Sequence, residues 1–171
     1  MTVMTTPRLA TKDEWHPIET PVGQMLLVGD TEHLHHLLLP DSFDLSELPP
    51  ERRGRPAAVE EAGRQVDAYF AYNLTRFDVP LDPAGTEFQR RVWFALADIA
   101  YGETESYGSL AARVGNPKAS RAVGMANGRN PIPLVLPCHR VIGSNGSLTG
   151  YGGGLPLKAR LLQHERSFSG E

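Results

Sequence analysis

A short segment with two prolines, residues 77–84, divides this chain into two parts with different patterns. Pro80 and Pro83 interrupt regular structure there, and the composition shifts soon afterwards. The first part opens with short strand-like runs, whereas the second is mostly helical in pattern. A chain of 171 residues is long enough for one good core or two small ones. We expect a flexible N-terminus (1–12), an N-terminal domain (13–80) and a C-terminal domain (81–171).

The first part predicts a sheet with one helix. Turn signals at Pro21-Val22-Gly23 and Gly29-Asp30 separate three short apolar runs. We interpret these runs as antiparallel strands over His16–Thr20, Gly23–Val28 and His33–Leu39. A loop over Pro40–Ala57 follows. Val59–Leu74 then carries Val66, Tyr69, Phe70 and Leu74 at helical spacing, which indicates a helix that covers the sheet.

The second part begins with helices. Thr86 and Gln89 form a capping-box pattern, and the apolar stripe that follows predicts a core helix through Phe88, Val92, Trp93, Leu96 and Ile99. Ser106 can cap a short helix over Tyr107–Val114. After a turn at Gly115, a second helix is expected with Asn116 as N-cap and Pro117 at its first position, carrying Lys118 and Arg121, with Arg129 just past its end. Two short helices with a tight turn are a helix-turn-helix candidate, although such pairs are also common packing units.

The last third leads to the chain's one cysteine. Pro131 and Pro133 end helical structure, and Leu134–Leu136 is expected as a short buried strand or extended run. Cys138 then starts a short helix or turn, where backbone N–H groups would lower the pKa of its thiol. A terminal helix over Pro156–Glu165 turns Leu157, Leu161 and Leu162 inward. The whole chain is an α/β (α+β) protein.

Charge is distributed unevenly along the chain. The formal net charge is −3, yet residues 106–164 hold seven Lys/Arg and no Asp or Glu. A surface that meets DNA would therefore lie in the second part, with weak, salt-sensitive affinity. No apolar run is as long as a membrane span, and Met1–Lys12 has no apolar signal core. One free cysteine fits a reduced cytoplasm.

Cys138 stands directly before His139. Cysteine and histidine together commonly make a thiolate nucleophile, because imidazole takes the thiol proton. A buried structural cysteine is the alternative, since free cysteine packs as a small hydrophobe. A cysteine hydrolase would need an oxyanion hole and a differently placed base. A redox sensor would need a resolving cysteine, which the chain lacks.

Three motifs together are more specific than the Cys-His pair. They are Arg121–Pro131, Pro137–Val141 and Gly150–Gly154. In this order and spacing they resemble the O6-alkylguanine-DNA alkyltransferases, and the resemblance spans about Thr86–Glu165. It implies a ribonuclease H-like N-terminal domain and a winged-helix-like C-terminal domain. It also implies direct, one-shot DNA repair, in which an alkyl group moves from O6-alkylguanine, and from O4-alkylthymine, to Cys138.

The resemblance also assigns catalytic roles. Cys138 is the alkyl acceptor, His139 is its base through a bound water, and Glu165 orients the imidazole. Tyr107 donates to the guanine and helps to turn the nucleotide out of the duplex. Asn130 is a structural hinge between the second helix and the cysteine segment.

The expected interface with DNA follows from the same family. The second helix enters the minor groove, and Arg121 enters the base stack in place of the flipped nucleotide; an ordinary phosphate contact is the alternative for Arg121. Backbone-level DNA contacts are expected at Gly108, Asn116 and Ser144. The alkylguanine pocket is expected to be lined by Met125, Pro133, Val141, Tyr151, Gly152 and Lys158.

The resemblance also leads to expectations about partners and cofactors. The partner is alkylated double-stranded DNA, bound by a monomer without an obligate protein partner or cofactor; cooperative binding along DNA stays open. The first part lacks the cysteine and histidine pattern that binds zinc in some relatives, so we predict no metal and interpret His35-His36 as a surface feature. A lesion-binding relative without catalysis is a further alternative, but in that group the cysteine is replaced.

Overall fold

The computed structural model describes residues 6–169, and the chain divides into two compact units at Pro83 and Ala84. Within 6–169 no helix has the length and apolar character needed to cross a membrane.

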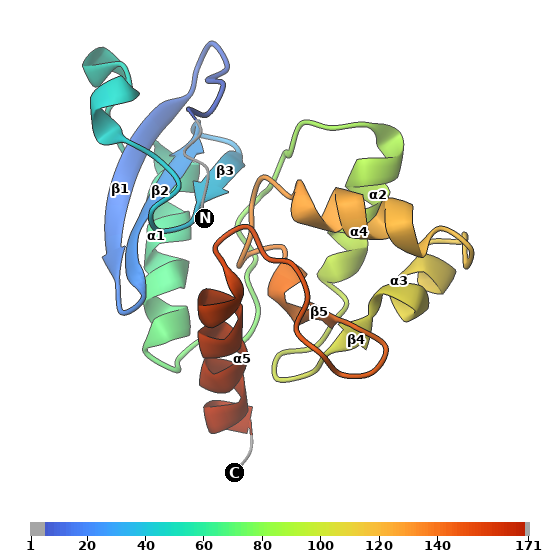
Figure 1. Ribbon diagram of the computed structural model, residues 1–171. Coiled ribbons are helices and arrows are strands. Elements are labelled where there is room, and N and C mark those ends of the chain that lie inside the picture. Colours follow the sequence, from blue (N-terminus) through green and yellow to red (C-terminus); the bar gives the residue numbers. More distant parts are fainter. Residues whose placement is uncertain (1–5, 170–171) are drawn as a thin grey trace. The chain divides into compact units, whose positions relative to one another are not determined.

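The first unit contains the predicted sheet. Strands β1 (Glu14–Thr20), β2 (Gly23–Gly29) and β3 (Leu34–Leu38) form an antiparallel sheet in the order β1-β2-β3 (Figure 1). Trp15 pairs with Val28, and Leu27 with Leu37. The three-stranded antiparallel prediction is confirmed, with strand ends that differ by one or two residues.

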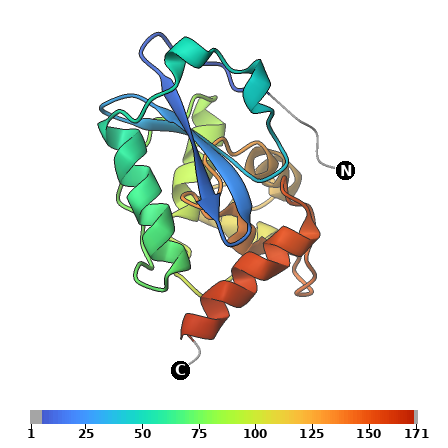
Figure 2. The same ribbon diagram turned by 90° about the vertical axis from the view of Figure 1, so that its left-hand side faces the viewer.

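Both faces of the sheet are covered. Helix α1 (Ala57–Phe70) packs along one face, and Figure 2 shows it beside the strands. On the other face Leu48 packs with Trp15, Leu26 and Val28. Leu48 lies between two short 3₁₀ helices, η1 (Leu45–Glu47) and η2 (Pro50–Arg52). The segment predicted as a loop therefore supplies part of the core.

Helix α1 ends earlier than its apolar spacing predicts. Tyr72 adopts a left-handed backbone with φ of 63°, and the N–H of Asn73 donates to the carbonyl of Ala68. This bond and the left-handed residue form a Schellman-type end. Leu74 lies beyond it, so its assignment to the helix is wrong.

His35 is not a surface feature. Its Nδ1 lies 2.6 Å from Oδ1 of Asp13, a carboxylate that is 1% exposed. His36 is also half-buried. Asp13, Asp30 and His35 bring their ligand-type atoms within 4.8 Å of one another. The interpretation of this pair as a surface feature is wrong for His35, because its imidazole pairs with a buried carboxylate, and His36 is only partly exposed; the absence of a metal stays a prediction.

The second unit is mostly helical. Helices α2, α3 and α4 pack against one another, and the indole Nε1 of Trp93 on α2 donates to the carbonyl of Ala126 on α4 at 2.7 Å. The capping box of Thr86 and Gln89 and the Ser106 cap are present. The elements are α2 (Glu87–Leu96), β4 (Glu105–Ser106), α3 (Tyr107–Arg113), α4 (Ser120–Gly128), η3 (Cys138–Arg140), β5 (Val141–Ile142) and α5 (Leu155–Ser169).

Two elements of this unit differ from the sequence prediction. Helix α4 begins at Ser120 and not at Pro117, because Asn116 closes a turn with its carbonyl, which accepts from the N–H of Ala119. Leu134–Leu136 is a tight turn and not an extended run, since Leu134 has φ of 74°. Ile99 lies just past the end of α2 but is buried as predicted.

Candidate functional site

A braced turn places Cys138. The side chain of Asn130 accepts from the N–H of Ile132 at 2.9 Å and donates to the carbonyl of Leu136 at 2.7 Å, so it spans the turn. Cys138 follows as the first residue of η3 and is 5% exposed. Nδ2 of Asn127 lies 3.4 Å from the carbonyl of Cys138. Two amide side chains therefore fix the backbone on both sides of the thiol.

The thiol is less acidic than the sequence predicts. Burial raises the pKa of Cys138 from 9.0 to about 11, although Asn130 and the charge of Lys158 oppose this rise. The prediction of a lowered pKa is wrong, because loss of hydration outweighs the polar groups that face the sulfur. At neutral pH Cys138 is a protonated thiol that needs a base to become a nucleophile.

This buried thiol gives a testable dependence of stability on pH. Above about pH 9 the unfolded thiol loses its proton, whereas the folded thiol keeps it up to about pH 11. The raised pKa therefore costs stability as pH rises through this window, by about 3 kcal/mol in total. We expect urea unfolding to show this alkaline loss in the unchanged protein and a smaller loss in Cys138→Ser. Parallel curves would contradict the raised pKa.

A buried group of charges surrounds the imidazole next to Cys138. Nε2 of His139 lies 2.7 Å from Oε2 of Glu165, and both side chains are fully buried. Glu165 also accepts from Arg140, at 2.9 Å from Nε and 3.1 Å from Nη2. Because Nε2 faces a carboxylate, the hydrogen-bond network assigns its proton there and leaves Nδ1 as the acceptor. Nδ1 is buried and has no hydrogen-bond partner among residues 6–169.

The pKa values of His139 and Glu165 are both shifted. Burial lowers the pKa of His139, and the nearby charges of Arg140 and Lys158 add to this, so its interaction with Glu165 is outweighed. Burial works to raise the pKa of Glu165, but hydrogen bonds and charges from His139 and Arg140 hold it far below the usual range. The site therefore holds a carboxylate anion, a guanidinium cation and a neutral imidazole.

Lys158 ties together the segment that follows β5. Its fully buried Nζ donates to the carbonyls of Val141 at 2.6 Å, Thr149 at 2.8 Å and Gly150 at 3.4 Å. The hydroxyl of Tyr107 lies 3.4 Å from the same Thr149 carbonyl. Tyr107 and Lys158 thus meet at one backbone oxygen, next to the Tyr151–Gly154 loop.

The other predicted site residues fall into a buried group and a solvent-exposed group. Pro133 and Val141 are buried close to Cys138 in the chain, and the hydroxyl of Tyr151 is buried without a partner among the described residues. Burial and the nearby Cys138 and Glu165 raise the pKa of Tyr151. The remaining predicted residues are exposed, namely Gly108, Asn116, Arg121, Met125, Ser144 and Gly152.

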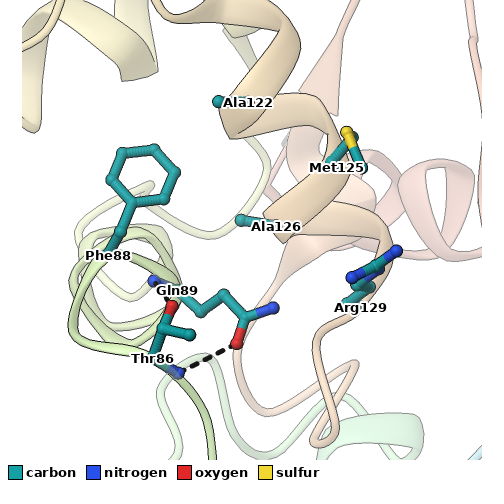
Figure 3. Close-up of a pocket in the computed structure, with 7 residues that line it drawn as sticks. All are labelled: Thr86, Phe88, Gln89, Ala122, Met125, Ala126 and Arg129. Atoms are coloured by element: carbon teal, nitrogen blue, oxygen red, sulfur yellow. Dashed lines mark hydrogen bonds between the residues drawn. The ribbon is translucent and has the colours of Figure 1, made fainter.

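Met125 is not one of the buried residues that surround Cys138. It is 60% exposed and lines a pocket between α2 and α4, shown in Figure 3. Phe88 and Gln89 form the α2 side of this pocket, and Arg129 lies at its α4 end. Cys138 is not among the pocket's lining residues. The structure thus places Met125 on the outer surface of α4.

Sequence reasoning missed Arg140 and Asn127. Arg140 is buried against Glu165, and Asn127 contacts the carbonyl of Cys138. The only signal for Arg140 is its position directly after His139. Charged residues are rarely buried without a partner, so the sequence alone favours a solvated arginine.

The chain matches two family domains over most of its length. Residues 15–83 match the "6-O-methylguanine DNA methyltransferase, ribonuclease-like domain", and residues 87–167 match the "6-O-methylguanine DNA methyltransferase, DNA binding domain". Together they cover both units of the fold.

Relatives match nearly their whole length. A methylated-DNA–protein-cysteine methyltransferase of Methanosarcina acetivorans is 52% identical over 149 residues, which are 87% of this chain and 96% of that protein. A protein of the same name from Mycolicibacterium paratuberculosis is 50% identical, over 91% of this chain and 94% of its own length. The crystal structure of Mycobacterium tuberculosis OGT in complex with DNA has a TM-score of 0.82 and 47% identity, and the match covers 91% of this chain and 94% of that one.

Proposed function

Since the chain belongs to the 6-O-methylguanine DNA methyltransferase family, we propose that its site moves the alkyl group of O6-alkylguanine in duplex DNA onto Sγ of Cys138. The chain repairs DNA by alkyl transfer to a cysteine, and its sequence holds one cysteine. The observation that carries the assignment is this single thiol, buried next to a neutral histidine whose Nδ1 is unpaired within the described residues.

The reaction is a displacement at the alkyl carbon. A bond forms between Sγ and that carbon while the bond from the carbon to guanine O6 breaks. Nδ1 of His139 takes the thiol proton, which finally goes to the guanine that leaves. Glu165 keeps the Nε2 proton in place throughout and stabilises the imidazolium that forms. The product is a thioether with no hydrolytic exit, so each molecule acts once.

The depth of Cys138 requires the nucleotide to leave the base stack. A thiol that is 5% exposed is out of reach of an alkyl group inside a duplex. We propose that Pro133, Val141, Tyr151 and Gly152 line the space that the extruded base takes next to Cys138. Tyr107 donates to the ring, while Lys158 holds the covering loop. O4-alkylthymine also carries its alkyl group on an exocyclic oxygen of the base and would react in the same way.

Helix α4 supplies the proposed contact with the minor groove. Arg121 is exposed near its start, and the exposed residues Ala122 and Gly128 of the same helix are small enough for close approach. Gly108, Asn116 and Ser144 are exposed and available for backbone-level contacts. The protein acts as a monomer without a protein partner, in the cytoplasm, where its thiol stays reduced.

Arg121→Ala tests how α4 holds DNA. We expect binding to duplex DNA to weaken by about tenfold, which is the loss of one good contact. An arginine that enters the stack leaves the dependence of affinity on salt unchanged, whereas a phosphate contact lowers the salt slope by about one. Fluorescence anisotropy at several salt concentrations measures both quantities. Arg166→Ala, an exposed arginine on α5, is the matched control; equal losses in both variants would contradict the role of α4.

Stoichiometry tests the proposed reaction. The protein is mixed with excess duplex that carries one O6-methylguanine, and restored guanine is counted over time. The proposal predicts one guanine per protein molecule and then no more. Continued turnover would indicate a hydrolase, and lesion-selective binding without restored guanine would indicate a recognition protein.

A further inference from the structure

Arg140 is a buried cation that the reaction as described does not use. Its side chain is 6% exposed and makes two hydrogen bonds to Glu165. Nη1 donates to the carbonyl of Ile99 at 2.6 Å, and the guanidinium lies 5.7 Å from the ring centre of Tyr101. These contacts leave the guanidinium one orientation, with its Nε edge toward the carboxylate.

The contacts of Glu165 indicate which group balances its negative charge. The carboxylate is fully buried and receives donors from His139, from Arg140 and, at 3.3 Å, from the N–H of Gly102. A buried carboxylate stays ionised only with a cation at contact distance. Two candidates are present, an imidazole and a guanidinium, and only the guanidinium is always charged.

We propose that Arg140 is a positioning residue, which holds Glu165 as an anion and thereby leaves His139 neutral, with Nδ1 free to take the Cys138 proton. This inference rests on the proposed transfer to Cys138. Without Arg140, the anion of Glu165 would recruit its counter-charge from the imidazole. A protonated imidazole has no free acceptor, so the first proton transfer would stop.

Apart from Glu165, the other groups near His139 either disfavour its protonation, as Arg140 does, or carry no charge at neutral pH. Lys158 reaches the site from α5 and disfavours a second positive charge, while Tyr151 and Cys138 keep their protons at neutral pH. Glu165 is the group that would draw a proton onto His139. The guanidinium opposes that attraction at hydrogen-bond distance from the carboxylate.

Two substitutions in the full chain separate charge from packing. Arg140→Gln removes the cation, and Arg140→Lys keeps it without the paired hydrogen bonds. The rate of alkyl transfer in a single turnover is measured from about pH 5.5 to about pH 9, with thermal unfolding at each pH. We expect Arg140→Gln to lose at least about ten times more rate at pH 6 than at pH 8.5, because His139 is then protonated at the lower pH. Arg140→Lys should keep the pH profile of the unchanged protein, with a uniformly lower rate.

The control and a second measurement keep the test decisive. Arg160→Gln, at an exposed arginine on α5, should match the unchanged protein at every pH. Loss of rate by the same factor at every pH in Arg140→Gln would overturn the inference and indicate a packing role only. If that variant does not fold, the ¹⁵N shifts of His139 in the unchanged protein decide: a neutral ring with its proton on Nε2 at pH 6 supports the inference, and a doubly protonated ring contradicts it. Failure of the unchanged protein to transfer the alkyl group would instead contradict the proposed function.

Discussion

Cys138→Ser is expected to abolish alkyl transfer while binding to alkylated duplex DNA stays unchanged. The buried thiol has a pKa of about 11, so its ionisation at pH 7 already costs about 5 kcal/mol. An alcohol is a much weaker acid and a poorer nucleophile toward an alkyl carbon, and His139 cannot activate it to the same degree. We expect the single-turnover rate to fall by more than about a thousandfold.

The measurement compares the variant with the unchanged protein on the same duplex. Restored guanine reports transfer, and fluorescence anisotropy reports binding. Serine is nearly the size of cysteine, so the fold should be kept, and thermal unfolding at neutral pH verifies this. Transfer that survives in Cys138→Ser would mean that another side chain accepts the alkyl group.

Glu165→Ala is expected to cost about 3–5 kcal/mol of unfolding free energy, because the substitution leaves the guanidinium of Arg140 buried without its partner. The loss depends on pH in a definite direction. The pKa of Glu165 is lowered by folding, so its contribution is complete above the unfolded value of 4.5 and is lost as pH falls below it. The unchanged protein should therefore lose more stability than Glu165→Ala between about pH 5 and about pH 3.

Urea unfolding at several pH values measures both effects. Glu103→Ala removes an exposed carboxylate from the same unit and serves as the matched control, with an expected change within about 0.5 kcal/mol. A loss in Glu165→Ala as small as that of the control would show that Arg140 is not held by this carboxylate.

Local signals account for the parts of the fold that the sequence predicts well. The strand runs are bounded by turns, and the capping box of Thr86 and Gln89 lies within four consecutive residues. Helix ends are harder to predict, because Tyr72 ends α1 in a left-handed conformation that glycine usually adopts. The start of α4 fails for a related reason: Asn116 is equally suited to cap a helix or to close a turn.

Tertiary effects account for what the sequence misses in the site. The motifs point to Cys138, His139 and Glu165, and the last two are in contact in the structure. The acidity of the thiol cannot be read from neighbours in the chain, since burial decides it. The burial of the Arg140 side chain depends in the same way on α5, because this helix places Glu165, which is 25 residues further along the chain, next to the guanidinium.

The most direct test of the account is to locate the transferred group. The protein is incubated with duplex DNA that bears one O6-methylguanine, digested, and examined by peptide mass spectrometry, with undamaged duplex in parallel. The account predicts one methyl group in place of hydrogen, on the peptide that contains Cys138 and at full occupancy, only with the damaged duplex. A methyl group on any other residue, or an unmodified protein beside repaired DNA, would contradict it.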